Sequence, residues 1–287
     1  MDCAVCILSI LCQLMLQKRQ MSRAIFDKIG HRRAEITTLT RDYAARHVIA
    51  LHFHEADQLV YASRGVMTVR TKHGIWVVPT DRAVWIPARI PHTITMSGTV
   101  AMRTLYLRRR LAKALPRNCC VVNVSALLRE LILRACAFSR LTKKASEQRH
   151  LIEIILDQLN AIQTVPLQLP NVSDARAGRI MQTLHNDPSD SRPLSELCRL
   201  GGASKRTVER LFQQDAGMTF GKWRQQLRLM RAMQLLAEGA KVTHAALEAG
   251  YSTPSAFISM FRKTLGTTPA SYFRAAKAGG EDNAKND

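Results

Sequence analysis

Acidic residues are scarce in this 287-residue chain, which has 22 Asp and Glu against 42 Lys and Arg and a formal net charge of +20. This excess favours polyanionic partners and predicts binding that weakens steeply as salt rises. The seven cysteines carry no pair of Cys-x-x-Cys spacings, which excludes a disulfide framework and favours reduced thiols in a cytosol. Hydrophobic residues make up 46% of the chain, which excludes a disordered protein and leaves room for two cores.

Long apolar runs are also missing. Residues 3–16 are apolar but too short to span a bilayer, and Lys18 and Arg19 follow them, the wrong polarity for a signal peptide. We therefore expect residues 1–20 to be an apolar extension ahead of a start near Met21. A short membrane-tethering or partner helix is the alternative, and no membrane is expected among the main partners.

A helix-turn-helix pattern occupies residues 194–215. Leucines at three-residue steps predict a leading helix, Gly201 and Gly202 permit a sharp turn, and Ser204 is a good N-cap for the helix that follows. The predicted buried stripe consists of Leu194, Leu197, Leu200, Val208, Leu211 and Phe212. The polar and cationic side chains of the second helix are left facing outward, as in helices that enter the DNA major groove.

The same pattern returns in residues 242–265. Gly250 makes the turn, Ser252 or Thr253 caps the second helix, and Pro254 stands at the helix start, where a missing N–H costs nothing. The predicted buried residues are Val242, Ala245, Ala246, Ala249, Phe257, Met260 and Phe261. Two such units in succession predict two DNA-reading helices.

One amphipathic helix is predicted between the units, from Phe220 to Leu236, about 25 Å long at 1.5 Å per residue. Its polar side carries Lys222, Arg224, Arg228 and Arg231. A spacer of that length would set the two recognition helices about one DNA turn apart. The alternative is an ordinary helical bundle with a solvated basic face. The segment from Arg192 to Arg274 has 13 Lys and Arg against 5 Asp and Glu, which favours DNA.

Residues 174–275 resemble the DNA-binding domain of the AraC/XylS family of bacterial transcription regulators. The resemblance is carried by Gly250-YSTPSAFISMFRKTLGTTP-Ala270 and by Tyr272. Many members have Arg where this chain has Ser259. The resemblance implies double-stranded promoter DNA as partner, and RNA polymerase as a second partner if the protein is an activator. The residues it places in the groove or on phosphates are Ser204, Lys205, Arg206, Arg210, Ser252, Thr253, Ser255, Ser259, Arg262 and Lys263.

The N-terminal half has a different period. Short runs at 65–71, 74–79 and 82–87 alternate in hydrophobicity between Gly, Pro and Asp, which predicts a small β-barrel or sandwich. His52, His54 and His92 resemble the histidines of the two cupin motifs, with Gln58 at the usual Glu position and Arg89 at a usual glycine. Alternate strand residues share a face, so His52 and His54 can both point inward.

The mouth of such a barrel commonly holds a small molecule, and in the AraC family an N-terminal cupin often binds the effector. We expect the effector to contact His52, His54, Gln58, Trp85 and His92. No cofactor is required. A metal ion on His52, His54 and His92 is the alternative, since three imidazoles suit Zn, Fe, Ni or Cu, and a third interpretation has them line the pocket by hydrogen bonds alone.

Two amphipathic helices are predicted in the region 109–164, starting near Val124 and Glu147. Their apolar faces pack either on the barrel or on a second copy, and the family resemblance favours a homodimer. The prolines Pro166 and Pro170 mark residues 165–173 as an interdomain linker. Residues 276–287 are expected to be a disordered tail.

The sequence therefore predicts an α+β protein of two domains: a cupin-like β-barrel (21–108) with a helical hairpin, and an all-α double helix-turn-helix domain (174–275). The predicted function is sequence-specific transcription regulation in the cytoplasm, controlled by a small-molecule effector. Two alternatives remain. One is a metal-dependent cupin enzyme with a DNA-binding tail, for which Glu55 and Asp57 are the nearby acids. The other is an architectural protein that binds DNA without sequence preference.

Overall fold

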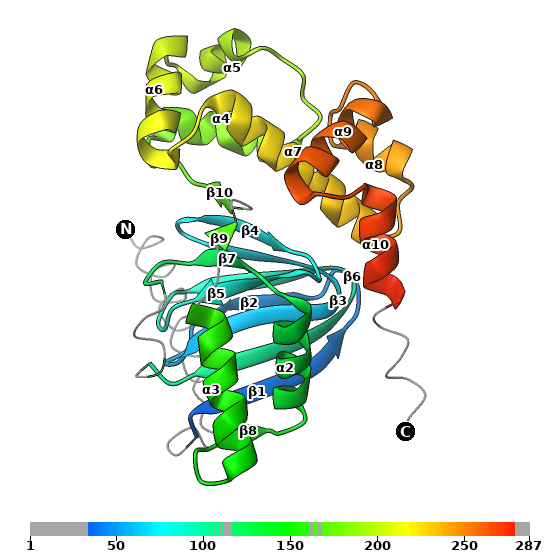
Figure 1. The fold of residues 1–287 in the computed structure, drawn as a ribbon. Helices are drawn as coiled ribbons and strands as arrows, with labels where there is room; N and C mark the ends of the chain where they lie inside the picture. The colour runs from blue at the N-terminus through cyan, green and yellow to red at the C-terminus, as the bar shows by residue number, and fades with distance from the viewer. Residues whose placement is uncertain (1–33, 110, 112–115, 161–163, 166–167, 279–287) are drawn as a thin grey trace, which may run out of the picture.

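The chain folds into a sheet-rich N-terminal part and a helical C-terminal part, which lies across one end of the sheet (Figure 1). The computed structural model describes residues 34–109, 111, 116–160, 164–165 and 168–278. The expected apolar extension, 1–20, and most of the expected tail, 276–287, lie outside these residues. None of the helices described is long and apolar enough to cross a membrane.

Ten strands form the sheet, and β6 is paired with β1, β2 and β3. The pairing path of the described residues runs β8-β1-β6-β3-β5-β7-β9 and has two ends, so closure into a barrel is not confirmed. The strands are β1 (Ile36–Tyr43), β2 (Val48–His52), β3 (Asp57–Thr71), β4 (Gly74–Val78), β5 (Arg82–Ile86), β6 (His92–Leu107), β7 (Cys120–Asn123), β8 (Arg140–Leu141), β9 (Thr164–Val165) and β10 (Gln168–Pro170).

Strand β3 joins two runs that the sequence separates at Gly65. The chain does not turn back there. Gly65 has a φ of +83°, and the pairing with β6 shifts register between Ala62 and Val66. A bulge of this kind bends a strand without ending it. Because of the bend, the first half of β3 pairs with β5 and the second half pairs with β4.

Helices α2 (Ala126–Cys136) and α3 (Ser146–Asn160) cover one face of the sheet. Leu128 and Ile132 of α2 and Ile152 and Ile155 of α3 are buried there with strand residues. Of the two alternatives for these helices, packing on the sheet is the one that the structure shows. Leu127 and Ile154 remain exposed, and the homodimer stays a prediction in which a second copy would cover them. Ser125 caps the start of α2, where its hydroxyl accepts a hydrogen bond from the Leu128 amide at 3.1 Å.

The segment expected to be a linker contributes two strands to the sheet. Strand β9 pairs with β7, and β10 pairs with β4. Leu169 is fully buried, although it stands next to Pro170. This part of the chain is therefore held by backbone hydrogen bonds to the N-terminal part.

Seven helices of the C-terminal part are described: α4 (Ala175–Asn186), α5 (Leu194–Gly201), α6 (Lys205–Ala216), α7 (Phe220–Ala237), α8 (Val242–Glu248), α9 (Pro254–Leu265) and α10 (Pro269–Ala278). Their buried faces follow the predicted stripes, although Leu194, Val242 and Met260 are only half-buried, and one residue is wrong. Leu200 is 47% exposed, and the neighbouring Cys198 is buried instead. Gly202 adopts a left-handed φ of +65° directly after α5, and the leading helix turns Cys198, not Leu200, toward the core.

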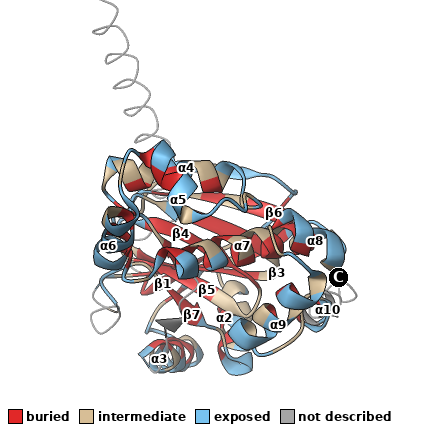
Figure 2. Cartoon of the chain, turned by 90° about the horizontal axis from the view of Figure 1, so that it is seen from above, coloured by how far each residue is buried: buried red, intermediate tan, exposed pale blue. Residues whose placement is uncertain are grey.

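Helix α7 connects the two parts of the molecule. It lies over the buried strands (Figure 2), and its residues belong to one apolar cluster that continues from the sheet into the helical part. The Gln234 amide donates to the Thr68 hydroxyl at 2.9 Å, and the Gln226 amide donates to the Gln168 carbonyl at 2.6 Å. At the far end, the Tyr272 hydroxyl of α10 donates to the Asp81 carboxylate.

Candidate DNA-reading helices and sensor site

Helix α6 presents a polar, cationic face to solvent. Ser204 caps it, with its hydroxyl accepting from the Thr207 amide at 3.2 Å, as predicted. Val208, Leu211 and Phe212 are buried on the opposite side. The three cations at or near the exposed face differ in their partners. Lys205 lies 3.8 Å from Glu209, Arg210 donates to Gln214 at 3.0 Å, and Arg206 has no ion pair with any described residue.

Helix α9 presents a second such face. The cap is Thr253, which accepts from the Ala256 amide at 3.1 Å, so the choice between Ser252 and Thr253 is settled for the cap. Phe257 and Phe261 are fully buried. A shallow groove runs along the exposed face, lined by Ser255, Ile258, Ser259, Arg262, Lys263 and Thr268. Thr268 and Ile258 were not among the predicted contact residues, since Thr268 stands beyond the helix itself.

The arginines of α7 were expected on its polar side, and two of them bind the loop between α4 and α5. Arg224 donates to the Arg192 carbonyl at 2.7 Å, and Arg228 donates to the Pro188 and Asp190 carbonyls at 3.2 and 3.0 Å. Carbonyl groups of a loop need such donors when no helix satisfies them. These arginines therefore hold α7 and the α4–α5 loop together.

The three histidines of the N-terminal part come together as predicted. The ligand atoms of His52, His54 and His92 lie within 4.8 Å of one another, and the His52 and His92 ring centroids are 4.3 Å apart. The cluster forms because the ends of β2 and β6 pair at His52 and His92. His92 is 1% exposed, whereas His52 and His54 are half-buried.

Two backbone carbonyls orient the rings. Nδ1 of His52 donates to the Ala50 carbonyl at 2.7 Å, and Nδ1 of His92 donates to the Ile90 carbonyl at 2.9 Å. A carbonyl only accepts, so both rings carry their hydrogen on Nδ1 and leave the Nε2 lone pair free. Burial lowers the pKa of His52, and burial together with His52 lowers the pKa of His92 to about 3. Both rings are therefore neutral at neutral pH, which is the metal-binding form.

The remaining predicted contacts divide between two faces of the sheet. Gln58 is buried on the histidine side: its amide donates to the Tyr106 hydroxyl at 3.4 Å, and the Tyr106 ring lies 4.8 Å from that of His54. The Gln58 Oε1 is buried without a hydrogen-bond partner among the described residues. Trp85 lies on the other face, under α2 and α3, where its indole N–H donates to the Pro116 carbonyl at 2.8 Å. The structure therefore does not bring Trp85 to the histidines.

Arg89 occupies the position at which the cupin pattern has glycine, and its φ is +68°. That left-handed conformation explains the glycine of the pattern. The Arg89 amide donates to the His54 carbonyl at 2.7 Å, and its side chain pairs with Glu55 at 2.8 Å. Asp57 accepts from the Ala88 amide at 2.8 Å. Both acids near the histidines are thus occupied in holding this loop, which leaves the enzyme alternative without a ready acid or base there.

A sheet domain with a histidine cluster, joined to a domain with two outward-facing cationic helices, defines a DNA-binding protein with a sensor domain. Residues 36–160 match the family model of the AraC-like ligand binding domain, and residues 197–275 match that of a helix-turn-helix domain. The chain belongs to the AraC family of helix-turn-helix transcriptional regulators. It is a DNA-binding transcription regulator with a ligand-binding N-terminal domain.

Similar proteins include the HTH-type transcriptional regulator NimR of Escherichia coli, 31% identical over 237 residues, which are 83% of this chain and 86% of NimR. The HTH-type transcriptional regulator RipA of Corynebacterium diphtheriae is 35% identical over 104 residues, 36% of this chain and 31% of RipA. Among solved structures, ToxT of Vibrio cholerae with a bound unsaturated fatty acid is 12% identical, covers 83% of this chain and 94% of that chain, and has a TM-score of 0.36. The relatives named are regulators and give the enzyme alternative no support.

Proposed function

We propose that α6 and α9 are the two helices that read promoter DNA, and that α7 spaces them along one face of the duplex. The observation that carries the proposal is the pair of capped helices whose exposed faces bear Arg206 and Arg262, each without an ion pair to a described residue. Unpaired guanidinium groups are free to bind a guanine edge or phosphates. Contact with RNA polymerase stays a prediction of the family resemblance.

Replacing both arginines, in the Arg206→Ala, Arg262→Ala variant, is expected to weaken specific DNA binding by about a hundredfold, since each such contact contributes about 1–3 kcal/mol. The measurement is selection of bound genomic fragments near physiological salt, followed by titration of the selected site. The matched control is Arg140→Ala, Arg149→Ala, which removes the same charge from exposed positions on β8 and α3. Equal losses in the two variants would reduce the effect to net charge and refute the proposal.

We further propose that the sensor site of the N-terminal domain is the histidine cluster and that it takes a transition-metal ion. Three observations support this. His52, His54 and His92 have converging ligand atoms, two of their rings are oriented by backbone carbonyls, and Nε2 of His92 is buried without a hydrogen bond. Metal-binding histidines usually donate their second ring N–H to such a carbonyl. A metal held by these three histidines would supply a charged centre for an effector carboxylate or hydroxyl.

Removing His92 tests this site. Wild-type protein dialysed against Zn²⁺ is expected to retain about one ion per chain, and the His92→Asn variant is expected to lose at least about tenfold in affinity, as is usual when a ligand or its support is removed. The control is His73→Asn, which changes an exposed histidine outside the cluster. Elemental analysis measures the ion, and a Zn²⁺-dependent rise in melting temperature reports its binding independently. Equal metal content in wild type and His92→Asn would refute the metal site and leave the effector to bind by hydrogen bonds.

A further inference from the structure

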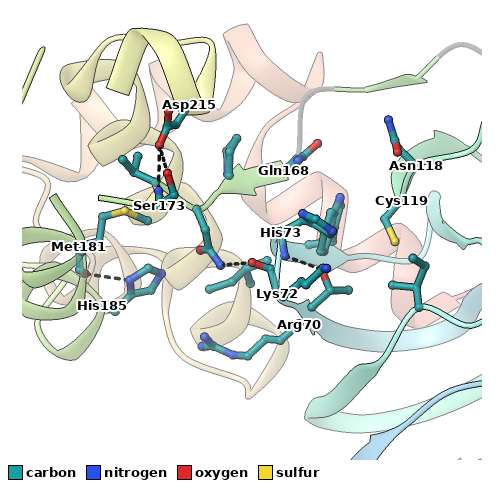
Figure 3. Close-up of a pocket in the computed structure, with 18 of the residues that line it drawn as sticks. Arg70, Lys72, His73, Asn118, Cys119, Gln168, Ser173, Met181, His185 and Asp215 are labelled. Carbon is teal, nitrogen blue, oxygen red and sulfur yellow. Dashed lines mark hydrogen bonds between the residues drawn. The ribbon is translucent and has the colours of Figure 1, made fainter. Parts of the chain in front are cut away.

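A cavity of about 930 Å³ lies between the two parts of the molecule, and none of the three clustered histidines is among the residues that line it. We name it the interdomain cavity. One wall comes from the β3–β4 hairpin and the chain before β7; the other comes from α4, the segment after β10 and the end of α6. Figure 3 shows Arg70, Lys72 and His73 on the sheet side and Ser173, His185 and Asp215 on the helical side. The volume suits a small organic molecule.

Three cations line this cavity without partners of opposite charge. Arg70, Lys72 and Arg117 form no ion pair with any residue that the structure describes. The one acid in the lining, Asp215, already accepts from the Ser173 amide and hydroxyl at 2.9 and 2.6 Å. Burial lowers the pKa of Arg70, so its charge is poorly solvated. Lys72 and Arg117 are exposed beside it. Three neighbouring cations without an acidic partner favour an anion.

Two further groups in the wall lack hydrogen bonds. The indole N–H of Trp76, a residue only 1% exposed, has no acceptor among the described residues. Nδ1 of His185 donates to the Met181 carbonyl at 2.8 Å, and its Nε2 is buried without a partner. Unsatisfied buried polar groups are costly, and a ligand with its own acceptors and donors relieves that cost. Apolar side chains stand beside them, among them Ile75 and Met181.

We propose that the interdomain cavity binds a small organic acid. Its anionic group meets Arg70, Lys72 and Arg117, and its carbon skeleton lies against the apolar side chains of the β3–β4 hairpin and α4. This position is separate from the DNA-reading end of α6. Asp215 stands ten residues after Lys205, about 15 Å along the helix. The cavity is therefore a ligand site of its own rather than part of the DNA-reading face.

A ligand that contacts both walls of the cavity stabilises the relative placement of the two domains in which those walls face each other. If that arrangement has a different affinity for DNA from other arrangements, ligand and DNA change one another's affinity by the same factor. This coupling rests on the proposed function. Binding of the acid itself does not, so it is tested without DNA.

The probe is anilinonaphthalene sulfonate, a fluorescent aromatic anion. Wild-type protein is expected to enhance its fluorescence in a saturable titration. The Arg70→Gln, Lys72→Gln, Arg117→Gln variant is expected to bind it at least about tenfold more weakly, because charge-assisted contacts are lost. The matched control is Lys143→Gln, Lys144→Gln, Arg149→Gln, which removes the same charge from exposed positions between and on α2 and α3. Circular dichroism checks that all three proteins are folded.

A second variant changes no charge. Gly178 of α4 lines the cavity, and a Cβ added there meets nothing within 4 Å. Gly178→Trp is expected to fill the space and weaken probe binding, whereas Gly178→Ala is expected to bind like wild type. Weaker binding in both the cationic and the filling variant supports the site. Equal titrations of wild type and the cationic variant, or no saturable signal from wild type, would overturn it.

Discussion

Trp223→Ala is expected to lower the free energy of unfolding by about 3–5 kcal/mol, because it removes a large, fully buried side chain from the first turn of α7. Trp223 is fully buried, its ring lies 5.5 Å from those of Phe212 and His185, and its indole N–H donates to the Pro170 carbonyl at 3.1 Å. The residue thus joins α7, α6, α4 and strand β10 at one point. Denaturant unfolding followed by circular dichroism measures the loss.

Trp223→Phe separates packing from the hydrogen bond. Phenylalanine keeps most of the apolar surface but leaves the Pro170 carbonyl without its donor, which costs about 1–3 kcal/mol. We therefore expect Trp223→Phe to lie between wild type and Trp223→Ala. A Trp223→Ala protein within about 1 kcal/mol of wild type would show that Trp223 does not hold the helical part together as the contacts indicate.

Gly98→Ala is expected to be nearly as damaging and to act at the junction of the two parts. Gly98 in β6 has a φ of +69°, and a Cβ placed on it would lie 2.3 Å from the Ala237 carbonyl oxygen at the end of α7. Both the backbone strain and the clash with a backbone atom oppose the substitution. Together they cost about 2–4 kcal/mol, and α7 must move away from the sheet.

Gly217→Ala is the matched control for that prediction. Gly217 has a φ of +65°, but a Cβ there meets nothing within 4 Å, so the variant carries the strain without the clash. Gly98→Ala is expected to be less stable than Gly217→Ala and to exchange the amide hydrogens at the end of α7 faster than wild type. Identical unfolding curves for the two variants would show that Gly98 and Ala237 are not in close contact in solution.

Local chemistry was predictable from the sequence. The Ser204 and Thr253 side chains each accept a hydrogen bond from the amide three residues further along the chain. Both partners of each cap therefore lie within one short stretch of sequence. His52 and His54 do lie together as expected, but β2 ends at His52, so strand alternation is not the reason. The left-handed Arg89 had a signal as well, since it stands at the glycine of the cupin pattern.

Long-range arrangement was not predictable in the same way. Leu169 pairs with Ile75 of β4, far earlier in the chain, and no local sequence pattern predicts that pairing. The sequence therefore predicts a linker at residues 168–170. The period of α7 shows one apolar face, yet Leu229 and Ala232 are also buried, because the helix is enclosed by both parts of the molecule. The interdomain cavity combines segments from Arg70 to Asp215 and has no local pattern at all.

The apolar cluster that passes through α7 has a thermodynamic consequence. Met67 and Met96 from the sheet belong to the same apolar cluster as Met233 and Leu236 from the helix. When two folding units share one core, unfolding of either unit exposes apolar surface of the other to water. A calorimetric scan of the whole chain should therefore show a single heat-absorption peak. A fragment starting at residue 174 should expose the sheet-facing side of α7 and self-associate.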